Sequence, residues 1–363
     1  MGSLRFLLAI SVVLVHSGSF FGYLIVDGFA AVEIFFIISG FYMTMILNKK
    51  YIGEGSYYLF FTNRLLRLFP IYFTVLLLTL FFYVGGGILF DKWGSLSPYI
   101  EYFDLYNIQT LLYLIITNIV LFGQDVVMFM GIEISSGALF FTSNFRDTDP
   151  MLYEFLLVPQ AWSIGVELLF YTIASFIVRK RPVVIIIFIV LSLMLRAFIY
   201  LFLGWTDDPW TYRFFPTELA LFLFGTLSFH FYEYLNTHKK LVIFQKPIVS
   251  IYLVLLVGYQ FISLDIPYFF HFKNWFIYLF SIVAIPYLFQ ATKTLKVDNF
   301  IGELSYPIYL IHMLIVTELT YLHIGSNKGI LTVIISVLVS VVLVKYIDVP
   351  IERFRQSRVN KQN

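Results

Sequence analysis

The chain has 363 residues, of which 60% are hydrophobic and only 13% are charged. Soluble domains carry about 25% charged residues, so this composition excludes a soluble globular protein and indicates one that crosses a membrane several times. The net charge of +2 at pH 7 says little about partners, and we expect no nucleic-acid partner. The lack of cysteine excludes disulfides, thiolate catalysis and cysteine-ligated metals.

Ten segments are long and apolar enough to cross a bilayer as helices, which takes about 20 apolar residues each. In chain order they are 4–23, 29–47, 65–84, 160–178, 182–203, 214–235, 247–264, 274–290, 299–323 and 329–348. The sequence therefore predicts an all-α polytopic membrane protein with about ten transmembrane helices in one domain, residues 1–348.

The long stretch 85–158 separates the third and fourth segments. It contains two shorter apolar runs, 108–123 and 126–143, and the second is interrupted by Gly131, Glu133 and Gly137. We expect an external or interfacial insertion. Twelve spans remain an alternative, in which the two runs cross together.

Basic residues are distributed unevenly among the connecting segments. If the N-terminus is inside and the ten spans alternate, most of the 24 lysines and arginines fall in inner segments. This asymmetry is typical of cytoplasmic loops. It predicts that both termini are cytoplasmic and that residues 349–363 form a basic cytoplasmic tail.

The first segment contains two ionisable side chains, Arg5 and His16. A helix rises about 1.5 Å per residue, so His16 lies roughly 16 Å further along the segment than Arg5. An imidazole at that depth needs a partner and is usually functional. Alternatively, Arg5 is only a topology signal and His16 is a hydrogen-bonded packing residue.

The second and third segments add a carboxylate, a small-residue pair and two arginines. Ser39 and the following glycine are explained by close helix packing, but that explanation does not cover Glu33. Arg64 and Arg67 are three residues apart and share one helix face. Paired arginines can bind phosphates bidentately, although the cytoplasmic bias of basic residues also explains them.

The fourth segment begins with Trp162 and Ser163 and carries Glu167 deeper in the membrane. Trp162 has the character of an interfacial residue. Glu167 requires a partner, and His16 and Arg196 are candidates.

The ninth segment places Tyr306, Tyr309 and His312 at three-residue steps, so they drift slowly around one helix face. An aromatic packing stripe explains the two tyrosines as well as a functional role does. His312 near the middle of the membrane is harder to explain by packing.

Together these residues resemble the acyltransferase-3 family of integral membrane acyltransferases over most of the chain. The resemblance rests on five motifs in the family order: Arg5 with His16; Glu33 to Phe41; Arg64, Arg67 and Pro70; Trp162 to Tyr171; and Ser305 to His312. The sequence has Glu33 where the family commonly has Asp, and Gly165 lies within the tryptophan–serine motif. We expect no counterpart here of the esterase-like domain that many members append.

The resemblance implies transfer of an acetyl group from acetyl-CoA to a hydroxyl of a cell-surface or exported polysaccharide or glycolipid. It implies a protein of the inner (plasma) membrane of a bacterium, with acyl-CoA as co-substrate, no permanently bound cofactor and no metal. On this basis we assign catalysis to His16, Glu167 and Glu33; acyl-donor binding to Arg5, Arg64, Arg67 and Ser39; and acceptor-binding or pore-lining roles to Trp162, Ser163, Tyr306, Tyr309 and His312. His16 is the expected general base or transient acyl acceptor, oriented by Glu167 or Glu33.

A proton-coupled transporter or channel is the competing hypothesis. It uses the same buried ionisable residues, His16, Glu33, Glu167 and His312, as a proton relay. It gives no reason for the paired arginines or for the order of the motifs. The sequence does not indicate the glycan, its hydroxyl, the acyl group or the oligomeric state.

Overall fold

The computed structural model describes residues 1–360 except 21, 105–106, 207, 264–268 and 326. The described chain is almost entirely helical, as predicted, and each of the ten predicted spans falls on a helix. These helices are α1 (Gly2–Ser17), α2 (Gly28–Lys49), α3 (Ser56–Phe90), α6 (Trp162–Ile177), α7 (Pro182–Phe202), α8 (Phe215–Thr237), α9 (Gln245–Val257), α10 (Phe269–Thr292), α11 (Lys296–Tyr321) and α12 (Lys328–Leu343).

Among the described residues, eight stretches of helix are both long and apolar enough to cross a membrane. They are Gly28–Lys49, Ser56–Phe90, Pro159–Ile177, Pro182–Phe202, Lys239–Val257, His271–Thr292, Lys296–Tyr321 and Lys328–Asn360. The short α1 and the more polar α8 are not among them. Both lie inside the bundle, α1 against α11 and α8 against α2, so they need not present a long apolar surface to lipid.

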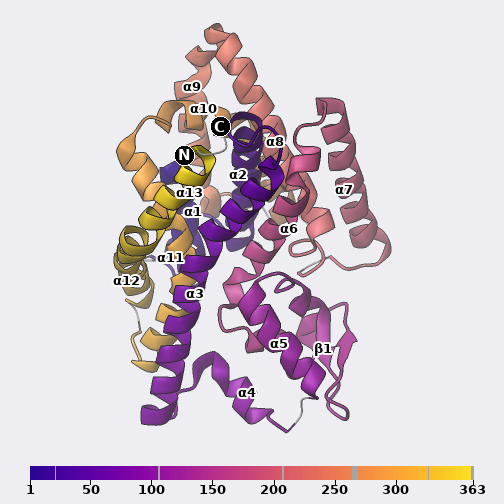
Figure 1. The fold of residues 1–363 in the computed structure, drawn as a ribbon, viewed down its shortest axis with the longest axis vertical. Helices are drawn as coiled ribbons and strands as arrows, with labels where there is room; N and C mark the ends of the chain where they lie inside the picture. The colour runs from indigo at the N-terminus through magenta and orange to yellow at the C-terminus, as the bar shows by residue number, and fades with distance from the viewer. Residues whose placement is uncertain (21, 105–106, 207, 264–268, 326, 361–363) are drawn as a thin grey trace.

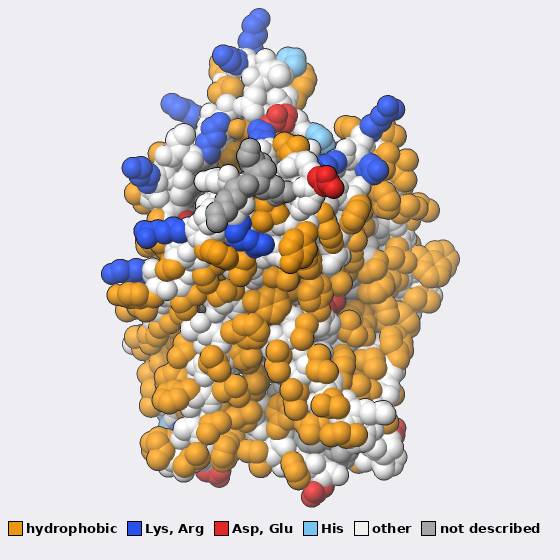
Figure 2. Space-filling model, viewed as in Figure 1, with side chains coloured by type: hydrophobic (Ala, Val, Ile, Leu, Met, Phe, Trp, Pro, Cys, Tyr) orange, Lys and Arg blue, Asp and Glu red, His pale blue; other side chains and the backbone are white. Residues whose placement is uncertain are grey.

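The molecule has one strongly basic end. Both termini lie there, while α4, α5 and β1 lie at the opposite end (Figure 1). Lysine and arginine side chains gather at this end, above a broad hydrophobic belt (Figure 2). Exposed members at the helix junctions include Lys49, Arg179, Lys180, Arg181, Lys239, Lys240, Lys246, Lys293 and Lys296. That this end faces the cytoplasm stays a prediction.

The stretch 85–158 forms short elements at the other end. After η1 (Gly94–Leu96) and α4 (Ser97–Glu101), the apolar run 108–123 forms α5 (Ile108–Val120). The run 126–143 forms a 3₁₀ turn, η2 (Val126–Phe129), and an antiparallel hairpin of β1 (Met130–Ile132) and β2 (Leu139–Phe141), with Met130 opposite Phe141. Gly137 has φ +65° in the hairpin connection, where a helix cannot continue. Further 3₁₀ turns are η3 (Phe145–Asp147), η4 (Leu152–Phe155) and η5 (Pro159–Ala161).

Glycines allow the central helices to touch. A Cβ atom at Gly40 of α2 would lie 1.8 Å from the carbonyl oxygen of Phe222 in α8, and one at Gly225 would lie 2.0 Å from the carbonyl oxygen of Ile37. The small-residue explanation of the glycine after Ser39 is therefore confirmed. This close contact fixes α2 in the centre of the bundle, with different neighbours on its two sides.

The C-terminal segment is a helix folded onto the bundle. The chain passes from α12 through a π-helical turn, η8 (Val344–Asp348), into α13 (Val349–Asn360). Arg358 of α13 donates hydrogen bonds to Asn63 (2.7 Å) and Thr62 (2.8 Å) of α3, and Arg355 is buried. Residues 349–360 therefore cover the basic end of α3, a packing role that the sequence did not predict. The remaining short turns are η6 (Lys239–Phe244) and η7 (Tyr259–Phe261).

Candidate functional site

A cavity of about 470 Å³ opens between α1, α2, α3, α6, α11 and α13, and we call it the basic cavity. Most of the predicted site residues line it: Arg5, Ser39, Arg64, Arg67, Ser163, Glu167, Tyr306 and Tyr309. These residues come from five separate helices, so only the fold brings the motifs into one place.

Positive charge exceeds negative charge in the basic cavity. Its lining includes the basic residues Arg5, Lys50, Arg64, Arg67 and Arg355 and the carboxylates Glu167, Glu303 and Glu352. Arg355 pairs with Glu352. Within the described chain, no carboxylate lies within ion-pair distance of Arg5, Arg64 or Arg67. Unneutralised guanidinium groups in a concave site are suited to an anion with several phosphates.

Glu167 lies on the wall of the basic cavity, where it accepts hydrogen bonds from two hydroxyls. The donors are Ser39 of α2 and Tyr171, one turn further along α6. Its partners are therefore neither His16 nor Arg196, the two candidates from the sequence. Arg5 and Arg67 act on this carboxylate electrostatically from across the cavity.

Ser163 and Tyr309 belong to a hydrogen-bonded group that joins α6 to α11. The Ser163 hydroxyl lies 2.7 Å from the Tyr309 hydroxyl, which donates to the carbonyl oxygen of Gln160 at 2.8 Å. Tyr306 donates to the carbonyl oxygen of Leu68 in α3 at 2.8 Å. Both tyrosines thus hold helices together while their side chains line the basic cavity.

His16 and His312 lie together just beyond the lining of the basic cavity. The ring centroid of His312 is 6.0 Å from that of Tyr309 and 5.2 Å from that of His16. The Nδ1 atom of His16 lies 2.9 Å from the carbonyl oxygen of Val12, and that of His312 lies 2.7 Å from the carbonyl oxygen of Tyr309. A carbonyl oxygen only accepts, so each Nδ1 carries the proton and each Nε2 keeps a free lone pair.

Glu33 lies on another side of α2 from Ser39 and has a different partner. Arg196 of α7 donates to Glu33 at 2.9 Å and to Glu218 of α8 at 2.8 Å, so one guanidinium joins two buried carboxylates. No contact joins Glu33 to His16 among the described residues. The expected orientation of the imidazole by Glu33 or Glu167 has no support in these contacts. Glu218 was missed, although an acidic residue inside the predicted span 214–235 was a signal.

Trp162 is buried, with 5% of its surface exposed, and is therefore not an interfacial residue. The guanidinium of Arg213 lies over its indole ring at 4.1 Å, and the ring of Tyr212 lies 4.8 Å away. Arg213 is fixed by Asp208, to which its Nη2 atom donates at 2.9 Å. Arg213 also acts electrostatically on the imidazole of His16, so this cluster lies close to His16.

The site residues predicted from the sequence lie within a segment that matches a known protein family. A family model described as an acyltransferase domain matches residues 2–347, from α1 into the η8 turn that follows α12. The chain belongs to the acyltransferase 3 family. Neither the comparison with curated proteins nor that with solved structures gives a match. The resemblance seen in the five motifs is confirmed, and the protein is a multi-pass membrane acyltransferase.

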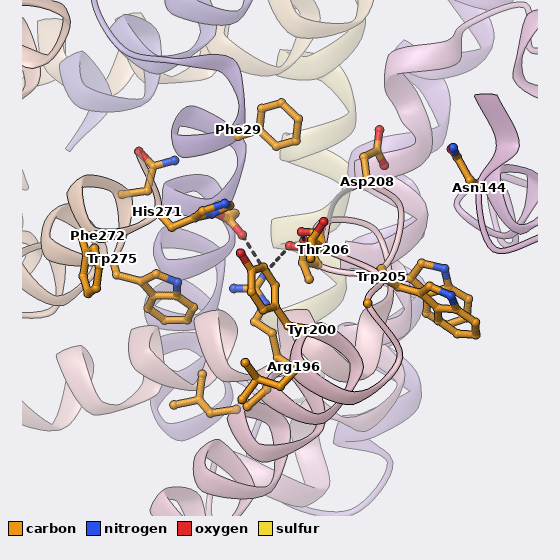
Figure 3. Close-up of a pocket in the computed structure, with 18 of the residues that line it drawn as sticks. Phe29, Asn144, Arg196, Tyr200, Trp205, Thr206, Asp208, His271, Phe272 and Trp275 are labelled. Atoms are coloured by element: carbon orange, nitrogen blue, oxygen red, sulfur yellow. Dashed lines mark hydrogen bonds and ion pairs between the residues drawn. The ribbon is translucent and has the colours of Figure 1, made fainter. Parts of the chain in front are cut away.

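This acyltransferase has a second and larger cavity, of about 1070 Å³, that the sequence did not predict. It lies on the Glu33 side of α2, between α7 and α10 (Figure 3). Phe29 and Glu33 line it, whereas Val32, Phe35, Phe36 and Ser39 line the basic cavity. One helix therefore separates two cavities, an arrangement suited to a reaction between two substrates.

Gly165, the departure inside the tryptophan–serine motif, has a packing reason. A Cβ atom there would lie 2.9 Å from the carbonyl oxygen of Leu121 and 3.1 Å from Oδ1 of Asp125. Asp125 is 3% exposed, and its Oδ1 atom has no hydrogen-bond partner among the described residues. Burial raises the pKa of the Asp125 carboxyl to about 6. The turn after α5 thus packs directly on the start of α6.

The sequence did not predict three further residues that line the basic cavity and supply a positive charge or a hydroxyl: Lys50, Tyr171 and Arg355. Lys50 and Arg355 lie in segments whose basic residues were attributed to topology. Tyr171 was visible one helical turn after Glu167, a spacing that brings two side chains together on a helix.

Proposed function

We propose that this acyltransferase moves an acetyl group from acetyl-CoA to a hydroxyl of a cell-surface or exported polysaccharide or glycolipid. The observation that carries the proposal is the set of three arginines, Arg5, Arg64 and Arg67, that line one cavity without a carboxylate partner among the described residues. CoA carries a pyrophosphate and a ribose phosphate, which guanidinium groups bind well.

The residues that line the basic cavity define the orientation in which we expect the donor to bind. Lys50 directly follows α2, and Arg355 belongs to α13, which lies near the two termini at the basic end (Figure 1). The phosphates would enter there, whereas Ser163 and Tyr309 lie where α6 and α11 contact each other. The thioester would then lie near Tyr309, whose ring neighbours that of His312. His312 is in turn the neighbour of His16.

His16 is the proposed general base. Its Nδ1 proton is engaged with Val12, which leaves Nε2 free to take the proton of the acceptor hydroxyl. The hydroxyl oxygen then forms a bond to the thioester carbonyl carbon, the C–S bond breaks, and the sulfur of CoA takes a proton from the imidazolium. The products are an O-acetyl ester and free CoA. A general base of this kind contributes about 10²–10⁴ in rate.

The proposed orientation has the basic end in the cytoplasm of a bacterium, where acetyl-CoA is present. The gathering of lysine and arginine at that end supports it. The acceptor is then reached from the other end, where α5 and the hairpin lie.

The test uses the purified full chain in nanodiscs with acetyl-CoA. We expect acetyl-CoA to raise the unfolding temperature, and slow thioester hydrolysis to fall by about 10²–10⁴ in His16→Ala. His238→Ala, which removes an exposed histidine, is the matched control and should hydrolyse at the wild-type rate. Radiolabelled acetyl-CoA without acceptor distinguishes direct transfer from an acyl-histidine route, since only the latter labels the protein.

One result would replace the proposal with the competing hypothesis. If acetyl-CoA neither binds nor reacts while the protein in liposomes conducts ions or solutes, the ionisable residues His16, Glu33, Glu167 and His312 serve transport.

A further inference from the structure

The larger cavity is rich in tryptophan, and we call it the tryptophan cavity. Of the five tryptophans in the chain, Trp205, Trp210 and Trp275 line it. Trp205 and Trp275 face each other across the cavity, with Tyr200 and Arg196 between them (Figure 3). Trp205 and Trp210 pack in a small apolar cluster with Phe129, Ile199 and Phe214, and they also present aromatic surface to the cavity.

The aromatic faces are held in place by their neighbours. Trp205 and Trp210 stack with their ring centroids 4.3 Å apart, and the indole nitrogen of Trp210 donates to the carbonyl oxygen of Ser143 at 2.8 Å. The guanidinium of Arg196 lies 5.1 Å from the ring of Trp275. The walls are therefore preformed, which is typical of a small-molecule site.

Polar groups with fixed orientation lie between the aromatic faces. Glu33 and Arg196 line the cavity and are held by their own ion pair. Asn274 is 4% exposed, and its Oδ1 atom accepts from Tyr259 at 2.6 Å. Among the described residues its NH₂ group has no acceptor, so it can donate to a ligand. A carboxylate, a guanidinium and an amide supply both acceptors and donors, which matches a ligand with several hydroxyls.

The cavity is bordered by apolar side chains on the belt of the molecule. Leu201 of α7 is 72% exposed and Phe272 of α10 is 71% exposed, and both line the cavity. Helix α7 packs chiefly on α8, and α10 packs on α8, α9 and α2. The exposed apolar residues of α7 and α10 that border the cavity therefore lie on a surface suited to contact with lipid.

We propose that the tryptophan cavity binds a pyranose ring of the acceptor, which enters between α7 and α10 on a membrane-anchored chain. Flat aromatic rings contact the C–H face of a sugar, and the polar groups between them bind its hydroxyls. The apolar rim at Leu201 and Phe272 then faces the anchor. This inference rests on the proposed function, because it assigns the acceptor side of the same reaction.

The start of α2 gives the acceptor a route to the reacting groups. Phe29 lines the tryptophan cavity and contacts Tyr212, with 4.3 Å between ring centroids. Gly28, the preceding residue, faces Val15, the neighbour of His16, because a Cβ atom on this glycine would lie 3.5 Å from the Val15 side chain. The first turn of α2 thus lies between the tryptophan cavity and the end of α1, where His16 lies.

The experiment measures glycoside binding by calorimetry with the full chain in nanodiscs. The probes are hexyl β-D-glucoside, hexyl β-D-galactoside and hexyl N-acetyl-β-D-glucosaminide, with their methyl glycosides and hexanol as the two halves of the ligand. We expect at least one hexyl glycoside to bind, and its Kd to rise about tenfold in Trp275→Ala. Trp93→Ala, which removes a tryptophan outside the cavity lining, is the matched control and should keep the wild-type Kd.

The outcomes separate this inference from the proposed function. Equal binding of the methyl glycoside would show a free saccharide rather than a membrane-anchored one and would overturn the lateral route. Equal binding of hexanol, no binding of any glycoside, or an unchanged Kd in folded Trp275→Ala would overturn the site. If acetyl-CoA binds in each of these cases, the proposed function stands; if it does not bind the wild-type protein, that function fails.

Discussion

Removal of Arg67 tests whether the basic cavity holds the phosphates of the donor. Arg67 comes from α3, lines the cavity, and has no ion-pair partner among the described residues, so Arg67→Gln leaves no partnered carboxylate without its cation. A hydrogen bond to a charged group contributes about 1.5–3 kcal/mol. Loss of one such contact should raise the Kd for acetyl-CoA about 10- to 150-fold.

The assay compares two donors of different charge. Binding of acetyl-CoA and of S-acetylpantetheine, which lacks the phosphates, is measured by calorimetry for wild type and Arg67→Gln. We expect the substitution to weaken only acetyl-CoA. Arg353→Gln removes the same charge from an exposed position on α13 that is not part of the cavity lining, so it controls for the general field of the basic end.

Two results would refute the reasoning. An equal loss of affinity for both donors would mean that Arg67 shapes the cavity and does not contact phosphate. An equal effect of Arg353→Gln would mean that the basic surface as a whole attracts the donor and that the cavity has no special part in it.

Two further predictions concern the framework around the site. Gly40→Ala forces a Cβ atom to within 1.8 Å of the Phe222 carbonyl oxygen, so α2 and α8 must separate, and we expect a loss of about 3 kcal/mol or more. Gly85→Ala, where a Cβ atom meets open space, is its control, and thermal unfolding in detergent compares them. For Asp125, the folded-state pKa of about 6 lies above the ordinary value of 3.8, so between these pH values the folded protein binds more protons than the unfolded chain. The free energy of unfolding should therefore fall by about 2 kcal/mol as pH rises from about 4 to about 6. Asp125→Asn should remove this part of the pH dependence of thermal unfolding, and parallel curves for both proteins would contradict it.

Hydropathy predicted the helices well because a lipid solvent leaves the backbone little choice. Each apolar stretch must satisfy its own hydrogen bonds, so length and composition alone indicate a helix. The same logic was weaker for 126–143, where Gly131 and Gly137 occur within an apolar run and the chain forms a hairpin. It was also weaker for residues 349–360, whose charge suggested a tail although they form α13 on α3.

The sequence predicted which residues belong to the candidate site, but not which of them contact each other. Motif spacing identified Arg5, Arg64 and Arg67, which do line one cavity with Ser39 and Glu167. Spacing along a chain carries no information on which helix neighbours which. The sequence therefore offered His16 and Arg196 as partners of Glu167, whereas the hydroxyls of Ser39 and Tyr171 fill that role.

The sequence by itself determined that this protein is a helical membrane acyltransferase with one basic end, because composition and ordered motifs are local properties of the chain. The tertiary structure decided that α2 separates two cavities, with Ser39 facing one and Glu33 facing the other. That division depends on the contact between Gly40 and α8. Which faces of a helix are covered depends on its neighbours in space, and those are fixed only when the whole bundle packs.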